Sequence, residues 1–270
     1  MRRNRAALLG VLVVMLSTGC SRLERLTLVR PSADRGEYTQ VAPVYDVSGR
    51  KAAGGPDAAA LVRGAVERVR RGELAEAERL AGQALKADPR SADAHAVLGN
   101  VAESRAQLAA AGRHYEAAAS LAPTVGIHAN NYGAWLCANG QAAASLPWFD
   151  RALADPAYPT PLGALANAGS CALKAGMAPR AEASWRQVLA AQPTHAAALA
   201  GMARLQFDQG RYLEARAFAE RWLAAMPQDP DGLRLAVAIE QKLGDNAAAS
   251  RYLSRLQGIP SGSTTPPPVR

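Results

Sequence analysis

A repeat period of 34 residues constrains this chain more than any other feature of its sequence. Small or aliphatic residues recur in steps of 34, 34, 36, 34 and 34, at Ala65, Gly99, Gly133, Gly169, Ala203 and Val237. Twelve residues after each comes a small residue, and four residues later another apolar or aromatic residue. Gly stands between the two halves of five of the six units, and Pro stands near the end of four of the six. This pattern predicts units that each consist of two helices joined by a short turn.

The alternation of small and large residues at this spacing resembles the tetratricopeptide repeat. The resemblance implies an all-α fold, a right-handed superhelical solenoid of six antiparallel helix pairs, because one pair cannot bury its apolar face alone. The six units are predicted at residues 58–91, 92–125, 126–161, 162–195, 196–229 and 230–258. The first helices of the pairs are expected to line the concave side.

The N-terminus predicts export and a lipid anchor. The basic segment MRRNR precedes eleven largely apolar residues, too few to span a bilayer, and LSTGC then ends at Cys20. This ending resembles a bacterial lipoprotein box, which implies loss of residues 1–19 as a signal peptide and acylation of Cys20. The residue after Cys20 is not Asp, which favours the outer membrane, with the protein anchored on its periplasmic side. The alternative is ordinary cleavage beside an incidental cysteine.

Polar segments flank the repeats. Residues 20–57 are interrupted by Pro and Gly and predict a flexible tether, and residues 259–270, with SGSTTPPPVR, predict a disordered Pro-rich tail. The formal net charge is +8, and removal of the signal segment with its three arginines leaves about +5. The chain has no dense basic stripe and no row of exposed aromatic residues, so nucleic-acid binding is not predicted.

Units three and four depart from the general repeat. They contain NNYGAWLC, DPAYPTP and NAGSCALKAG, and unit three is two residues longer than the others. With these motifs, the chain from Cys20 through the six repeats resembles the type IV pilus biogenesis/stability lipoprotein family known as PilW or PilF. The resemblance implies a pilotin that binds the secretin subunit or another pilus-assembly protein, promoting secretin localisation and multimerisation or stabilising the pilus. The alternative is a general periplasmic scaffold for outer-membrane protein assembly or cell-wall hydrolase recruitment.

Four asparagines mark a candidate peptide groove. Asn131 and Asn167 each stand two residues before a repeated Gly, at a position that resembles the clamp asparagines of peptide-binding tetratricopeptide domains. An amide side chain offers two donors and an acceptor to the backbone of an extended peptide. The alternative is that these side chains bond adjacent repeats to each other. Asn100 and Asn130 are expected to face or flank the same groove.

Two aromatic residues and two cysteines accompany these asparagines. Tyr132 and Trp135 would form an aromatic floor to the groove, unless they belong to the core. Cys137 and Cys171 lie on the first helices of neighbouring units, near their middles and about two residues apart in register. In an oxidising periplasm we expect them to form a disulfide. The alternative is two buried thiols that pack as small apolar groups.

No catalytic or metal site is predicted from the sequence. The four histidines fall at different positions of the repeat, and none has a second ligand three or four residues away. Gly-rich phosphate loops, hydrolase elbows and Ser/His/Asp arrangements do not occur. We therefore expect a protein that is not an enzyme, with no cofactor and no small-molecule substrate.

Overall fold

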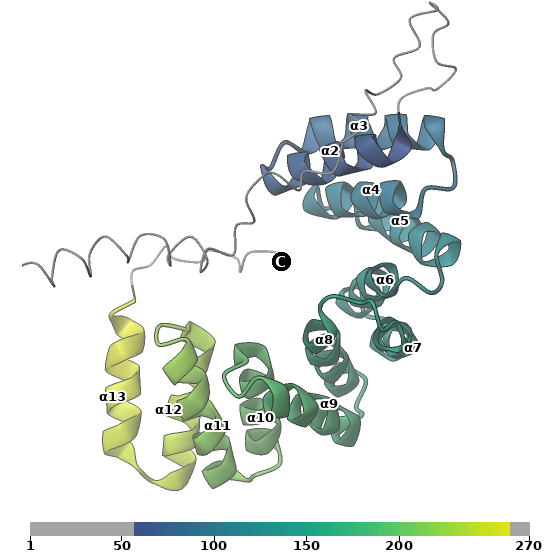
Figure 1. Cartoon of the computed structure of the whole chain (residues 1–270). Coiled ribbons are helices and arrows are strands. Elements are labelled where there is room, and N and C mark those ends of the chain that lie inside the picture. Colours follow the sequence, from purple (N-terminus) through teal and green to yellow (C-terminus); the bar gives the residue numbers. More distant parts are fainter. Residues whose placement is uncertain (1–56, 260–270) are drawn as a thin grey trace, which may run out of the picture. The chain divides into compact units, whose positions relative to one another are not determined.

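The computed structural model describes residues 57–259, and every regular element in this range is an α-helix (Figure 1). The signal peptide, Cys20, nearly all of the tether and all but the first residue of the tail lie outside the described residues. None of the helices described has the length and apolar content needed to cross a membrane. The helices are α2 (Ala58–Arg70), α3 (Leu74–Ala87), α4 (Ala92–Ser104), α5 (Leu108–Leu121), α6 (Gly126–Ala138), α7 (Ala142–Ala154), α8 (Pro161–Lys174), α9 (Ala178–Ala191), α10 (Ala196–Asp208), α11 (Tyr212–Ala225), α12 (Pro230–Leu243) and α13 (Asn246–Gln257).

These twelve helices form six consecutive antiparallel pairs, which confirms the predicted fold class. Each pair packs most extensively within itself, and its second helix packs against the first helix of the next pair (Figure 1). Every predicted unit holds one pair, except that α8 already begins at Pro161, the last residue assigned to unit three. Proline suits the first position of a helix, because its φ is already helical and its missing N–H is not needed there.

The turn inside five of the six pairs depends on a glycine with positive φ. At Gly176, for example, φ is 76°, and the N–H groups of Gly176 and Met177 donate to carbonyls of the preceding helix at 2.9 and 2.8 Å. Left-handed backbone is disfavoured for residues with a Cβ atom, which explains the repeated Gly. Unit two has Ala106 at this position with φ 57°, and the same two hydrogen bonds form there.

The repeated glycines of the first helices let aromatic rings approach the backbone. A Cβ atom at Gly99 would lie 2.7 Å from the ring of Tyr115, and one at Gly169 would lie 2.5 Å from Trp185 Nε1. Trp185 is 1% exposed, donates to the carbonyl of Ala166 at 3.3 Å, and also covers Gly201 of the next unit. The small-to-large alternation in the sequence therefore corresponds to rings that fill space over glycine, within a unit and between units.

The DPAYPTP segment, with which unit three is two residues longer than the others, folds back onto the start of that unit. Val125, the N-cap of α6, offers no side-chain cap, and the carboxylate of Asp155 instead accepts from the N–H of Gly126 at 2.8 Å. Tyr158, 8% exposed, packs over the same glycine. The DPAYPTP segment thus caps α6 from the far end of its own unit, which fixes the position where α8 begins.

Candidate functional site

The helix pairs present two different faces. First helices of successive units touch one another, as α6 does with α4 and α8, whereas among the described residues the second helices make no comparable contact with each other. Neighbouring units are therefore closer on the side of their first helices, as predicted for a concave side. We call the surface of α2, α4, α6, α8, α10 and α12 the first-helix face.

Two of the predicted asparagines meet on this face. The side-chain amide of Asn167 on α8 donates to Oδ1 of Asn130 on α6 at 3.4 Å, a long hydrogen bond. Asn167 is exposed and Asn130 is half-buried. Asn131 is the residue at the same repeat position as Asn167, but the residue of unit three that contacts Asn167 is Asn130. The contact joins adjacent repeats, and each amide keeps further donors or acceptors for another chain.

The other two asparagines lie at positions equivalent to residues of this face. Asn131 occupies the same repeat position as Asn167, and Asn100 on α4 occupies the position of Ala134 and Ser170. Both Asn131 and Asn100 are half-buried. They extend the polar surface toward unit two without joining the contact between Asn130 and Asn167.

Cys137 and Cys171 form a disulfide between units three and four. Their Cα atoms are 5.8 Å apart, and both residues are buried. The prediction that they lie near the middles of their helices is wrong: Cys137 is the twelfth residue of α6 and Cys171 the eleventh of α8, so both lie toward the helix ends.

A small pocket opens beside this disulfide on the first-helix face. Its volume is about 190 Å³, and it is lined by Ala134, Cys137, Ala138, Asn167, Ser170, Cys171 and Lys174. Pockets for small-molecule ligands usually exceed about 300 Å³. The size and the lining, which combines apolar groups with an amide, a hydroxyl and the ammonium group of Lys174, suit one side chain of a bound polypeptide.

Tyr132 does not belong to this groove, and its assignment as a groove residue is wrong. Its ring stands edge-on to Trp148 of α7, with centroids 4.8 Å apart, and stacks beside Trp135 at 6.1 Å. Burial, together with the nearby Glu116 of α5, raises the pKa of Tyr132. Trp135 in turn donates to the carbonyl of Leu108 at 3.2 Å. Both aromatic residues therefore pack against second helices, which corresponds to the core alternative.

Histidine pairs in units two and three were missed from the sequence. His128 on α6 is 3% exposed, and its Nε2 lies 3.1 Å from Oδ1 of Asp93 on α4. His95 and His114 face each other with their Nδ1 atoms 3.1 Å apart. Burial lowers the pKa of all three rings, although Asp93 opposes this effect at His128. The partners come from different helices, so no local spacing could indicate them.

A second pocket, in the last two units, is strongly charged. It has a volume of about 300 Å³ and is lined by Arg216, Glu220, Glu240, Asp245, Ala248, Arg251, Tyr252 and Arg255. Arg216 binds the buried Glu240, with Nε donating to Oε1 at 2.9 Å, and Arg255 donates to the carbonyl of Pro227. Its acids and arginines are equal in number and partly engaged with each other, so it carries no excess charge of one sign.

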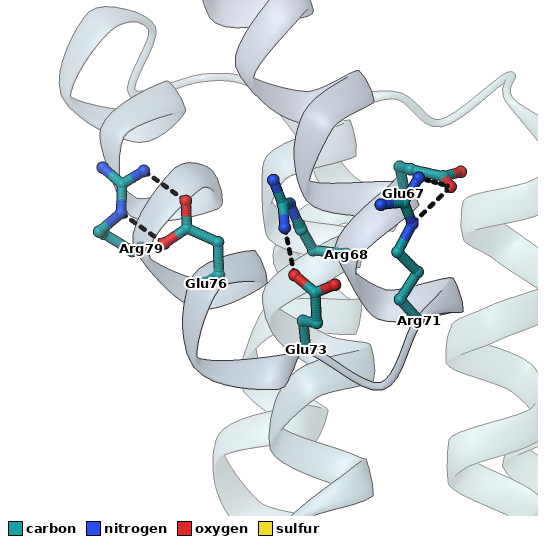
Figure 2. A network of polar contacts seen from close by, with 6 residues as sticks. All are labelled: Glu67, Arg68, Arg71, Glu73, Glu76 and Arg79. Atoms are coloured by element: carbon teal, nitrogen blue, oxygen red, sulfur yellow. Dashed lines mark hydrogen bonds and ion pairs between the residues drawn. The ribbon is translucent and has the colours of Figure 1, made fainter.

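Unit one shows a further charged network on its surface (Figure 2). Arg71 pairs with Glu67 at 3.0 Å, Arg79 pairs with Glu76 at 2.6 Å, and Arg68 and Glu73 form an ion pair across the turn between α2 and α3. All these side chains are partly or largely exposed, so salt screens their interactions. These six charged side chains pair with one another, in contrast to the uncharged asparagine surface of α6 and α8. Of the residues described, no three could together hold a metal ion.

Comparison with known proteins agrees with this architecture. Two tetratricopeptide-repeat family models match residues 62–126 and 172–239. The solved structure of PilW, a widely conserved type IV pilus biogenesis factor, matches with 32% identity and a TM-score of 0.69, over 74% of this chain and 92% of PilW. A comparison with curated protein sequences gave no match.

Two further structures share the fold at lower identity. PilF of Pseudomonas aeruginosa matches with 23% identity and a TM-score of 0.68, over 76% of this chain and 93% of PilF. YrrB, a tetratricopeptide-repeat protein with an unusual peptide-binding site, matches with 22% identity and a TM-score of 0.56, over 66% of this chain and 91% of YrrB.

Proposed function

This chain belongs to the same tetratricopeptide-repeat family as PilW, and on that premise we propose that it is a non-enzymatic scaffold for type IV pilus biogenesis. The observation that carries the proposal is that the likeness to PilW extends over nearly the whole of PilW and includes the repeats that form the asparagine surface. The partner we propose is the secretin subunit, which the scaffold helps to localise and multimerise in the outer membrane.

The first-helix face supports a role in binding another polypeptide. Asn130 and Asn167 keep amide groups for hydrogen bonds with a second chain, and the adjacent pocket has room for a side chain. The disulfide holds these two helices in register, so the groups that meet the partner are pre-positioned and less conformational entropy is lost on binding.

The lipid anchor completes the proposal. Acyl chains on Cys20 hold the protein on the periplasmic side of the outer membrane, and the long segment before the first helix lets the repeats reach their partner. The sequence LSTGC supports this anchor. Two or more acyl chains give stable attachment, because each buried methylene contributes about 0.8 kcal/mol.

The experiment that tests this function is a gel of unboiled outer-membrane fractions, probed for the secretin, from a deletion strain of the source bacterium. Complementing chains are the wild type, Cys20→Ala, and the double variant Asn130→Ala/Asn167→Ala. Asn246→Ala, at an exposed asparagine of the last unit, is the matched control. Surface pili are counted in the same strains.

The expected result is loss of the detergent-resistant secretin ring on deletion, with recovery in the wild type and the control only. Intact rings with missing surface pili would move the role to pilus stabilisation. Normal rings and normal pili in the deletion strain would refute the proposal and favour a general envelope scaffold.

A further inference from the structure

The centre of the first-helix face is uncharged. Residues 117–149 contain no Asp, Glu, Lys or Arg, and on α6 and α8 together the only such residue is Lys174, in the last turn of α8. His128, the histidine of these two helices, is buried against Asp93. We call the exposed and half-buried part of this surface, formed by Ile127, Asn130, Ala134, Ala138, Asn167 and Ser170, the neutral face.

The units on both sides of the neutral face carry charges. The first helix of unit two has Asp93 and Glu103. On α10 an ion pair joins Arg204 and Asp208 at 3.0 Å, and on α12 Arg234 pairs with an aspartate one turn away at 2.7 Å. The near-absence of charge is therefore particular to the first helices of units three and four and is not a general property of this chain.

The groups that the neutral face does offer are suited to a polypeptide backbone. The amides of Asn130 and Asn167 can each donate and accept, and Ile127, 44% exposed, adds an apolar contact. The Ser170 hydroxyl already donates to the carbonyl of Ala166 at 3.1 Å, so it offers only an acceptor. The pocket of about 190 Å³ beside the disulfide has space for a small side chain.

A charged side chain would bind this face poorly. It would give up water on docking and find no counter-charge on α6 or α8 except at Lys174, and burying an unpaired charge is costly. An uncharged segment has a smaller desolvation cost on binding, because its backbone exchanges hydrogen bonds with water for hydrogen bonds with the asparagines.

We infer that the neutral face selects an extended, uncharged polypeptide segment with small side chains, which pairs its backbone with Asn130 and Asn167. The inference rests on the proposed scaffold function and adds the chemical class of the segment recognised. Such binding depends little on ionic strength, because no ion pair between the partners has to be screened.

The test uses residues 21–270, which omit the predicted signal peptide and the predicted lipidation site Cys20. The probe is an array of random peptides of about eight residues, which span roughly 25 Å when extended. Peptides that bind the wild type are expected to be depleted in Asp, Glu, Lys and Arg, and their binding should be equal at low and high salt. Asn130→Ala/Asn167→Ala should weaken their binding by about tenfold, equivalent to 1.4 kcal/mol.

A single isosteric substitution tests the charge selection directly. Asn167→Asp adds one carboxylate at an exposed position of the neutral face, and the peptides it binds should become enriched in Lys and Arg. Asn246→Asp, which makes the same change on α13, should leave the selection unchanged. Circular dichroism checks that both variants remain folded.

Three outcomes would overturn the inference. The first is enrichment of acidic peptides that is lost in Lys174→Gln, which would assign the site to carboxylates. The second is binding of neutral peptides that the double asparagine variant leaves unchanged, and the third is no bound peptide at all. Because the array measures peptide binding and the deletion strain measures secretin rings, failure of the inference can be distinguished from failure of the proposed function.

Discussion

Replacing Ala106 by glycine should stabilise the protein. The turn of unit two places Ala106 in left-handed backbone with φ 57°, and its N–H and that of Gln107 donate at 2.9 and 2.8 Å, as in the turns closed by glycine. Left-handed backbone costs a residue with a Cβ atom about 1–2 kcal/mol. Glycine removes this cost but gives the unfolded chain about 0.4–1 kcal/mol more conformational freedom. The net gain for Ala106→Gly is therefore about 0.5–1 kcal/mol.

The matched control is the reverse change, Gly176→Ala, at the equivalent turn of unit four. A Cβ atom there would touch nothing within 4 Å, so its effect isolates the backbone. Thermal unfolding followed by circular dichroism should show Ala106→Gly melting about 1–4 °C above the wild type and the control below it. If Ala106→Gly melts at or below the wild-type temperature while the control behaves as expected, the reasoning on backbone strain is refuted.

Three further perturbations test the packing, the disulfide and the buried histidines. Reduction of the Cys137–Cys171 disulfide, which closes a loop across 34 residues, should cost about 3–4 kcal/mol, measured by urea unfolding with and without dithiothreitol; an equal midpoint in both samples would contradict it. Gly201→Ala pushes a Cβ atom into a buried indole and should lower stability by about 1–3 kcal/mol in the same assay, whereas an unchanged midpoint would show that the ring can move. Burial lowers the pKa of His128 and His114 below the ordinary value near 6.5. As the pH falls, these two histidines are therefore protonated in the unfolded chain before they are protonated in the folded chain. The free energy of unfolding should therefore be highest above about pH 7 and decrease below about pH 6, and His114→Gln should weaken this pH dependence. A urea midpoint that does not change with pH would contradict this prediction.

The helix pairs could be predicted because the signals that define them are local. The turn glycines, the terminal prolines and the small residue that faces an aromatic ring all recur at fixed spacing, and each acts within one unit or on the next. Cys137 and Cys171 became a candidate pair for the same reason, since the period places them on neighbouring first helices.

Contacts between side chains of different helices could not be predicted from the repeat spacing of the sequence alone. The period aligned Asn131 with Asn167, but parallel neighbouring helices bring Asn130 to Asn167, because side chains meet by their direction and not by their repeat position. Tyr132 was assigned to the groove although it points toward the second helices, where Trp148 meets it. The cap that Asp155 provides to α6 was also missed, because the N–H it binds lies 29 residues earlier in the chain.

The covalent link between units three and four changes how this array can come apart. In a stack where each unit contacts only its neighbours, opening starts at either end and passes from one interface to the next. The interface closed by the disulfide cannot separate in this way, so opening from each end should stop there and leave a closed centre. A segment docked on α6 and α8 would then stay bound while the outer units open, including when force is applied through the lipid anchor that we propose at Cys20.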